Sequence, residues 1–265
     1  MMKIDKYLIE DENVILLKRF SVIGKTETYK AKIQNLAELA EDEKWSNGQD
    51  DDYSILINYI NKTFEKIAEE DQIEITDDEE YACFNTGLLT PYGEDIYCLF
   101  TKSKTPGTLH WYLDGFYPES DWKIVDNFKK LPSVASYFQS DKDLLFNSNA
   151  TIIINSTHIL DDHFEERFPE EIKKLGKFNI INAIKGSLEI TKKRIKRNHR
   201  IAIPLYYKGK ITYLIPVNIN DYRIALVVEK IDDERYRANT IFTLDMAYSS
   251  ARLLMKPEVD WLIEK

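Results

Sequence analysis

The chain has 265 residues and a net charge of −9 at pH 7, with 43% hydrophobic and 31% charged residues. These values are ordinary for a globular protein and exclude a fibrous or disordered chain. No run approaches the roughly 18 apolar residues that a membrane span requires, and the charged N-terminal sequence lacks the apolar stretch of a secretory signal. We therefore expect a cytoplasmic protein that does not act at a membrane.

The N-terminal third is predicted to combine a short arm with two helices. Residues 1–31 are expected to form the arm or a short hairpin, with strands at 7–10 and 14–20. Helices are predicted at 32–44 and 52–70, because apolar residues recur there at the spacing of one helix face.

The middle of the chain is predicted to be richer in strands. Short aromatic runs bounded by glycine and proline predict strands at 81–84, 96–101 and 109–113. The elements expected after them are a helix at 132–138, a strand at 151–154 and helices at 161–168 and 169–175. Cys83 and Cys98 form no metal-binding pattern and are expected to be buried, reduced thiols in strands.

The last third of the chain has the clearest pattern. A long helix is predicted at 178–197, and four apolar or alternating runs follow it, at 201–207, 211–216, 222–229 and 235–240. Short polar turns separate these runs, which indicates an antiparallel meander. A helix at 244–255, capped by Thr243, completes the pattern.

This order of elements predicts the fold class. Strands and helices are segregated rather than alternating, which favours an α+β fold. We expect a mixed or antiparallel sheet with a C-terminal β-meander, several helices packed on it, and a helical pair near the N-terminus. No internal repeat is visible in the sequence, and residues 32–265 are expected to form a single domain.

Charge is distributed unevenly along the chain. Residues 36–80 hold sixteen acidic and three basic residues, a net charge of −13, whereas residues 185–200 hold seven basic residues and one acidic residue, a net charge of +6. Two interpretations fit the basic segment. It is a solvated face whose cations complement the C-terminal dipole of the long helix, or it binds the phosphates of a nucleic acid or nucleotide. The residues that would contact phosphate are Lys185, Lys192, Lys196, Arg197, Asn198 and Arg200.

One face of the predicted C-terminal helix carries three polar residues. Asp245, Tyr248 and Arg252 are spaced at i, i+3 and i+7, which places them on the same side. An arginine held by an aspartate can bind a phosphate or carboxylate with two nitrogens, and a tyrosine can donate a hydrogen bond or stack on a nucleobase. Alternatively, Asp245 and Arg252 form a structural pair and Tyr248 packs in the core.

The densest polar cluster surrounds His158. This histidine follows an apolar strand, a position that suits a general acid or base. Asp161 or Asp162 would orient it or hold a divalent metal, but His158 and His163 are five residues apart, the wrong spacing for two ligands on one helix face. The alternative is a loop whose polar groups cap helices. We assign no metal and no cofactor.

A turn rich in asparagine, glycine and threonine spans residues 85–93. The Asn85 amide and the backbone N–H groups near Thr86 could bind a phosphate or the edge of a nucleobase. The lysine and spacing of a P-loop are missing, which disfavours hydrolysis of a nucleoside triphosphate. The alternative is a plain hairpin that uses glycine for its geometry.

Several of these segments together resemble an uncharacterised family, the domain of unknown function 3825. The motifs are Asn85-Thr86-Gly87-Leu88, Arg167-Phe168-Pro169, Arg197-Asn198 and Leu244-Asp245-Met246-Ala247-Tyr248, within a resemblance that spans residues 32–262. The resemblance implies a bacterial protein whose relatives often join this domain to small RNA-binding modules, such as cold-shock domains or LOTUS-type winged helices. The presence of RNA-binding modules in these relatives suggests that the family acts on RNA.

The resulting hypothesis is an RNA-processing protein that acts on phosphodiester bonds or RNA ends through a basic phosphate-binding cleft. In this hypothesis, His158 is the acid–base residue, and Arg197 or Arg252 stabilises the charge that develops on phosphorus. No metal is needed, so the enzyme would be a metal-independent ribonuclease or an RNA-end-processing enzyme. The alternatives are a non-catalytic module that binds RNA or a phosphorylated nucleotide, and a protein-interaction module whose acidic helices dock a basic surface.

Overall fold

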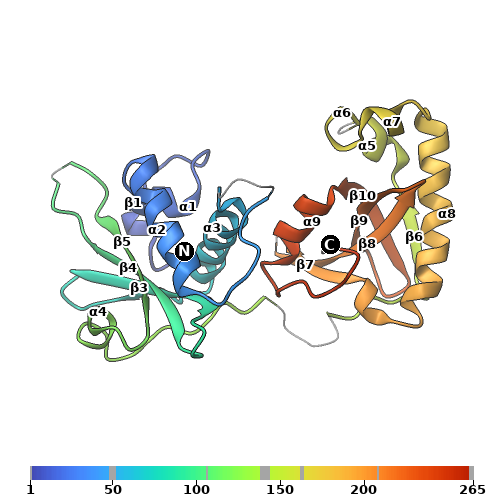
Figure 1. Ribbon diagram of the computed structural model, residues 1–265. Helices are drawn as coiled ribbons and strands as arrows, with labels where there is room; N and C mark the ends of the chain where they lie inside the picture. The colour runs from blue at the N-terminus through green and yellow to red at the C-terminus, as the bar shows by residue number, and fades with distance from the viewer. Residues whose placement is uncertain are drawn as a thin grey trace. The chain divides into compact units, whose positions relative to one another are not determined.

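The computed structural model describes residues 2–47, 52–105, 107–137, 144–161, 164–207 and 209–262. The chain divides into two compact units, which we call the N-terminal unit (Met1–Ser136) and the C-terminal unit (Tyr137–Lys265). Each unit has one five-stranded mixed sheet with helices packed against it (Figure 1). The α+β class expected from the sequence is confirmed.

The N-terminal unit is built on the sheet β1-β5-β4-β3-β2, in which β1 is parallel to β5 and the other neighbours are antiparallel. Its elements are η1 (Asp5–Tyr7), α1 (Leu16–Phe20), β1 (Ser21–Val22), α2 (Thr26–Leu39), α3 (Ser54–Glu69), β2 (Glu74–Ile75), β3 (Tyr81–Leu89), β4 (Asp95–Lys102), β5 (Trp111–Pro118) and α4 (Trp122–Val125).

Helices cover both faces of this sheet. Phe64 of α3 packs its ring against Phe84 of β3 and Phe100 of β4. Ile124 of α4 packs in a separate cluster with Cys83, the neighbour of Phe84. Because successive strand residues point to opposite faces, α3 and α4 lie on opposite sides of the sheet. Cys83 and Cys98 are buried and free, in strands β3 and β4 as expected.

The strands predicted at 7–10 and 14–20 are wrong, because the structure has η1 and α1 in this part of the chain. Leu17 and Phe20, three positions apart, are both buried, since one helical turn directs both toward the core. The Phe20 ring centroid lies 5.1 Å from that of Phe100. A short apolar run fits a strand or a helix equally well, so packing decides between them.

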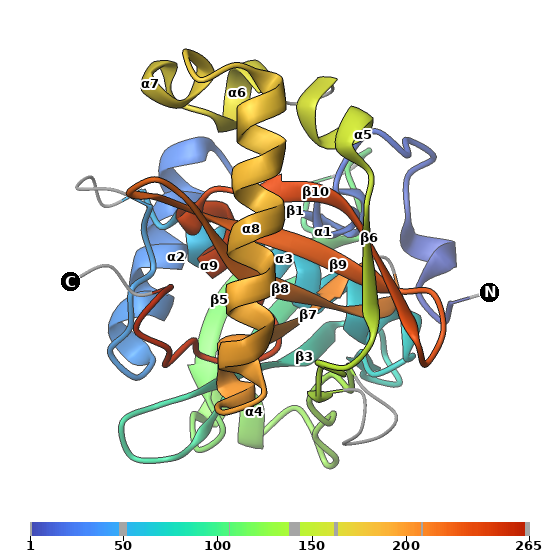
Figure 2. The same cartoon turned by 90° about the vertical axis from the view of Figure 1, so that its right-hand side faces the viewer.

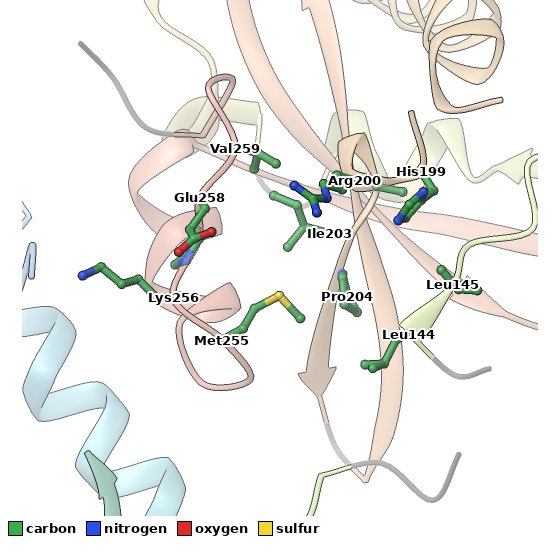
Figure 3. A pocket seen from close by; sticks show the side chains of 12 residues that line it. Leu144, Leu145, His199, Arg200, Ile203, Pro204, Met255, Lys256, Glu258 and Val259 are labelled. Carbon is green, nitrogen blue, oxygen red and sulfur yellow. The ribbon is translucent and has the colours of Figure 1, made fainter. Parts of the chain in front are cut away.

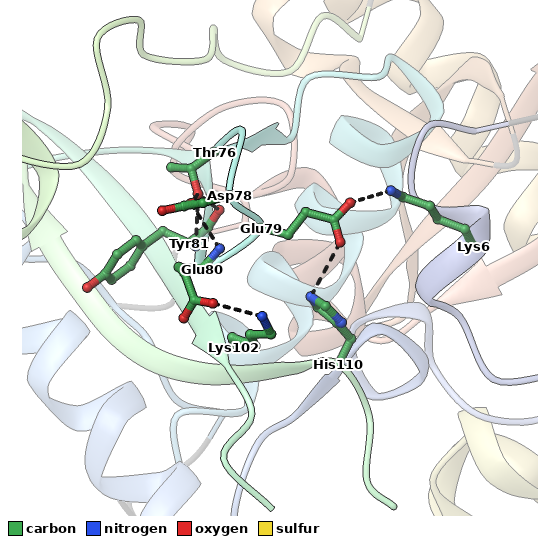
Figure 4. A network of polar contacts seen from close by, with 8 residues as sticks. All are labelled: Lys6, Thr76, Asp78, Glu79, Glu80, Tyr81, Lys102 and His110. Atoms are coloured by element: carbon green, nitrogen blue, oxygen red, sulfur yellow. Dashed lines mark hydrogen bonds and ion pairs between the residues drawn. The ribbon is translucent and has the colours of Figure 1, made fainter. Parts of the chain in front are cut away.

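A polar network holds the first residues of the chain to the sheet (Figure 4). Lys6 Nζ donates to Glu79 Oε1 over 2.6 Å, and His110 Nε2 lies 3.9 Å from Glu79 Oε2. The ring of Tyr7 packs against His110, with centroids 4.9 Å apart. The hydrogen bond to Glu79 raises the pKa of Lys6 to about 12, and the same contact lowers the pKa of Glu79.

The C-terminal unit is built on the sheet β6-β10-β9-β8-β7, in which β6 is parallel to β10 and the other neighbours are antiparallel. Its elements are β6 (Thr151–Ile154), α5 (Ser156–Asp161), α6 (Phe164–Arg167), α7 (Glu170–Lys173), α8 (Lys177–Ile195), η3 (His199–Ile201), β7 (Ile203–Tyr207), β8 (Lys210–Ile219), β9 (Tyr222–Lys230), β10 (Arg235–Phe242) and α9 (Leu244–Ala251).

The main core of this unit lies between α8 and the sheet. Ile184 and Leu188 of α8 belong to one buried cluster with alternate residues of β8, among them Ile215 and Val217. Helix α9 packs against β7, β9 and β10 and lies on the other face of the sheet (Figure 1). The long helix and the four-stranded meander are therefore confirmed, as is the cap of α9, where Thr243 accepts a hydrogen bond from Met246 N.

The helix predicted at 132–138 is wrong over 132–137, and residue 138 lies outside the described residues. The segment has no regular structure, and Ser136 N donates to the carboxylate of Glu70 rather than to a carbonyl four residues earlier. A side chain from α3's C-terminal end thus satisfies a backbone donor that a helix would have used.

The two units share one topology, although the sequence shows no repeat. In each, a first strand is followed by helices, a four-stranded antiparallel meander and a final helix, and the first strand pairs parallel with the last. Strands β1 to β5 thus correspond in order to β6 to β10, and α4 corresponds to α9. The expected single domain over 32–265 stays a prediction, because two compact units can still unfold as one cooperative domain.

Candidate nucleic-acid interface

The basic segment is positioned by helix α8. The apolar stripe predicted for this helix is confirmed, since Ile181, Ile184, Leu188 and Ile195 are all buried. Two side-chain hydrogen bonds fix the helix to β8. Thr191 Oγ1 donates to Pro216 O over 2.9 Å, and Asn218 N donates to Ser187 Oγ over 2.7 Å. These contacts set which face of α8 is turned to solvent.

Two of the basic residues at the C-terminal end of α8 contact backbone carbonyls. Lys192 Nζ donates to Ala150 O over 3.1 Å, just before β6, and Arg197 Nη1 donates to Lys193 O over 2.7 Å. A cation at the last carbonyls of a helix also complements its dipole. Lys192 and Arg197 therefore make structural contacts, and the contact of Arg197 fits the interpretation of cations that complement the helix dipole.

In the part of the chain that the structure describes, the other basic residues of this segment have no acidic partner. Within the described residues, no ion pair with a carboxylate forms anywhere between Lys185 and Arg200. At the opposite end of α8 the pairing is different, because Lys173 binds Glu165 and Glu170, and Lys177 binds Asp161. Lys185, Lys193 and Lys196 are exposed, so their charges face solvent uncompensated. We call the basic residues of 185–200 the α8 basic face.

The α8 basic face continues into a short turn that borders a pocket (Figure 3). Asn198 caps η3, with its Oδ1 accepting from Arg200 N over 3.2 Å. His199 and Arg200 line a pocket of about 320 Å³, together with the start of β7 and the loop after α9. Trp261 Nε1 donates to Ile201 O and ties the C-terminal segment to the same turn. Arg200 is the one predicted phosphate ligand that lines this pocket.

His158 lies at the other end of α8. It is half-buried on α5, where its backbone N–H donates to Asn155 Oδ1. Asp161 of the same helix binds Lys177, the first residue of α8, and α5 lies near this end of α8 (Figure 2). Fifteen residues of helix separate Lys177 from Lys192, which is about 22 Å. The structure does not bring His158 together with Arg197. Asp162 and His163 lie outside the described residues.

The polar residues of α9 form a third, separate group. Asp245 is exposed, Tyr248 is buried at 4% exposure, and Arg252 is half-buried at the C-terminal cap of the helix. Burial of Tyr248 agrees with the interpretation that this ring packs in the core. Because α8 and α9 lie on opposite faces of the sheet, the α8 basic face and the α9 residues do not form one cleft.

Asn85 and Thr86 belong to the N-terminal unit and are buried. Asn85 Oδ1 accepts from Gly87 N over 2.8 Å, and Thr86 Oγ1 donates to Ile96 O over 2.6 Å. They stand where the pairing of β3 with β4 shifts register, and Gly87 adopts φ +73° there. Their polar atoms thus stabilise an irregular hairpin, as the alternative interpretation held.

Within the described residues, no group of three or more histidine, cysteine or acidic side chains is arranged to hold a metal ion. No helix in the described part of the chain is long and apolar enough to cross a bilayer.

A comparison with protein families gives a match. The family described as "Domain of unknown function (DUF3825)" matches residues 36–261. The chain belongs to this family. The match covers most of both units, and the resemblance noted from the sequence is confirmed. No curated protein and no solved structure matches the chain significantly.

Proposed function

We propose that this protein binds single-stranded RNA through its phosphate backbone, along the α8 basic face. The observation that carries the proposal is the set of exposed basic residues with no carboxylate partner within the described residues, in a protein whose net charge is −9. Neighbouring cations that lack carboxylate partners repel one another. A bound polyanion neutralises these charges and removes the repulsion.

The shape of the site favours a flexible strand over a small ligand along the helix. Lys185, Lys192 and Lys196 lie along one flank of α8 and are separated by at most eleven residues, about 16 Å. The exposed Lys193 lies beside this line, about 100° around the helix from Lys192. A line of separated cations follows a backbone, whereas a small anion needs converging donors. The choice of RNA among polyanions rests on the resemblance alone, which implies relatives that often join this domain to small RNA-binding modules.

Catalysis is not part of this proposal. The mechanism drawn from the sequence needs His158 and an arginine at one phosphate, but His158 lies near the first turn of α8 and Arg197 follows its last turn. A general acid or base must reach the reacting group within about 3 Å, directly or through one water. For the pair of His158 and Arg197, this separation disfavours the ribonuclease mechanism, and we therefore propose the binding module.

The test is a titration of labelled, unstructured RNA with a triple variant, Lys185→Gln, Lys193→Gln and Lys196→Gln. Lys192 is left in place because its ammonium group bonds to Ala150 O. We expect affinity to fall about tenfold at 0.1 M salt. The slope of log K against log salt should become shallower by about 2, as removal of three phosphate contacts requires for a single strand.

A matched control removes the same charge elsewhere in the C-terminal unit. Lys177→Gln, Lys210→Gln and Lys230→Gln change three lysines that pair with carboxylates. This variant should keep the affinity and salt slope of the wild type. Equal losses in both variants would show that only net charge matters, and absence of binding by the wild type would overturn the proposal.

A further inference from the structure

The pocket beside the α8 basic face combines three kinds of surface. Its apolar wall includes Met255 and Leu145, which are 40% and 57% exposed, and the buried Ile203 and Pro204 of β7. Large apolar side chains that stay exposed around a concave site indicate a ligand with a flat or apolar part. A volume of about 320 Å³ is near the lower limit of ligand pockets, which suits one nucleotide.

The pocket is lined by Arg200 of η3 and by Lys256 of the loop that follows α9. Arg200 is exposed and, within the described residues, forms no ion pair, although Glu258 also lines the pocket. Figure 3 shows Arg200 and His199 at one side, with Met255 and Glu258 on the loop that follows α9. Because Arg200 follows Arg197 by three residues, a strand bound along α8 would meet this pocket at the C-terminal end of the helix.

A carboxylate inside a phosphate-binding region needs an explanation, because it repels the phosphate. Glu258 is exposed and has no ion-pair partner within the described residues. A carboxylate accepts hydrogen bonds and donates none. The donors that a nucleotide offers at its sugar are the ribose hydroxyls, and an acidic residue on these hydroxyls is a known means of recognising ribose.

We propose that this pocket binds the 3′-terminal nucleotide of single-stranded RNA that ends in a free ribose diol. The nucleobase packs on Met255 and Pro204, Arg200 binds the phosphate on the 5′ side of that nucleotide, and Glu258 accepts hydrogen bonds from the 2′- and 3′-hydroxyls. This inference rests on the proposed RNA binding and adds to it a preference for the chemistry of the strand's end.

The experiment measures the affinity of one 5′-labelled RNA sequence prepared with three ends: a free diol, a terminal 2′-deoxynucleotide and a 3′-phosphate. For the wild type, we expect the 2′-deoxy end to bind roughly fivefold more weakly than the diol end. The 3′-phosphate end should bind at least tenfold more weakly, because it places a second anion against Glu258.

Two variants separate the pocket from the α8 basic face. Glu258→Gln should bind all three ends within about twofold of one another, because a neutral amide does not repel the 3′-phosphate and is a weaker acceptor for hydroxyls. Lys193→Gln, outside the pocket, should weaken all three ends equally and keep their order. Binding of RNA that is insensitive to its end would overturn this inference and leave the proposed function standing. A wild type that binds none of the three RNAs would overturn both.

Discussion

Helices α3 and α8 hold the same place in the shared topology but differ in their charges. Each precedes the meander of its unit, and each packs on the second strand of that meander, β3 or β8. Helix α3 is also packed by α1 and α2, and its lysines are paired, Lys62 with Glu65 and Lys66 with Glu70. Helix α8 has an apolar stripe on the sheet and, from its middle to its C-terminal end, the α8 basic face, which forms no ion pair within the described residues.

This difference distinguishes the residues that the fold requires from those that can vary without changing the fold. Both helices need apolar residues against their sheet, and Ile60 and Ile184 are each 0% exposed. The charges outside that stripe are not needed for packing, so an identical topology can carry either kind of surface. Function must therefore be argued from the surface of α8, and the topology alone says nothing about it.

The largest effects should come from the buried stripes themselves. Ile60→Ala and Ile184→Ala each remove a fully buried side chain, so each should lower the free energy of unfolding by about 2–5 kcal/mol. If residues 32–265 form one domain, urea unfolding should show a single transition, and both variants should move it to lower urea. Two transitions, each displaced by only one of the variants, would show that the units unfold independently and would contradict the single domain.

Smaller effects are expected at the helices that follow each meander. Asp121 Oδ1 accepts from Lys123 N over 2.8 Å at α4, and Thr243 Oγ1 accepts from Met246 N over 3.4 Å at α9. Replacement of either cap by alanine should cost about 1 kcal/mol, with the larger loss at Asp121, whose bond is shorter and whose charge complements the helix dipole. Thermal unfolding measures both losses.

Conservative replacements test whether these caps act through their hydrogen bonds. Asp121→Asn and Thr243→Ser keep an acceptor at the same place and should retain most of the stability. If they lose as much as the alanine variants, the side chains act by another contact. None of the four substitutions touches the α8 basic face, so RNA affinity should stay unchanged in all of them.

The smallest effect concerns the N-terminal segment, which has no counterpart in the described part of the C-terminal unit. The hydrogen bond from Lys6 lowers the pKa of Glu79 below its ordinary 4.5. Its stabilising contribution is therefore complete above that value and is lost as the pH falls through the lowered pKa. Protection of residues 2–8 against hydrogen exchange should fall roughly two- to threefold between pH 7 and pH 3, because exposed ion pairs contribute little.

A variant lacking the charge provides the control for this pH effect. Glu79→Gln should show at pH 7 the weaker protection that the wild type shows only at pH 3. Its protection should not change further on acidification at Asp5, Tyr7 and Leu8, whose amides donate to backbone carbonyls rather than to carboxylates. A wild type whose protection is the same at both pH values would show that Tyr7 and its ring contact with His110 hold the segment without the ion pair.

The sequence predicted best the elements whose packing is periodic over many residues. The sequence predicts helix α8 and strands β7 to β10 because four or more apolar positions repeat in each region. A repeat of that length rarely arises by chance. The run 14–20 has too few positions to distinguish helix from strand. The shared topology could not be predicted, because it depends on which strands pair. Ser21 pairs with Trp111, which is 90 residues later in the sequence.

The candidate site was predicted only in part, for a related reason. A charge count located the α8 basic face, but it could not show that Lys192 and Arg197 bond to carbonyls. Met255 and Glu258 of the pocket were missed, since neither belongs to a charged cluster or a motif. Only the fold brings the loop after α9 beside η3, more than fifty residues earlier in the chain. The available signal was Pro257, which follows Met255 by two residues and ends the predicted helix.

The parallel pairing of first and last strands has a consequence for how the protein is made. Thr151 of β6 pairs with Arg235 of β10, 84 residues later, so this edge of the second sheet stays open until those residues have been synthesised. At roughly 5–20 residues per second on a ribosome, β6 waits about 4 to 17 s for its neighbour. A nascent or truncated chain that stops before Arg235 keeps unpaired N–H and C=O groups along β6, which makes it a substrate for chaperones.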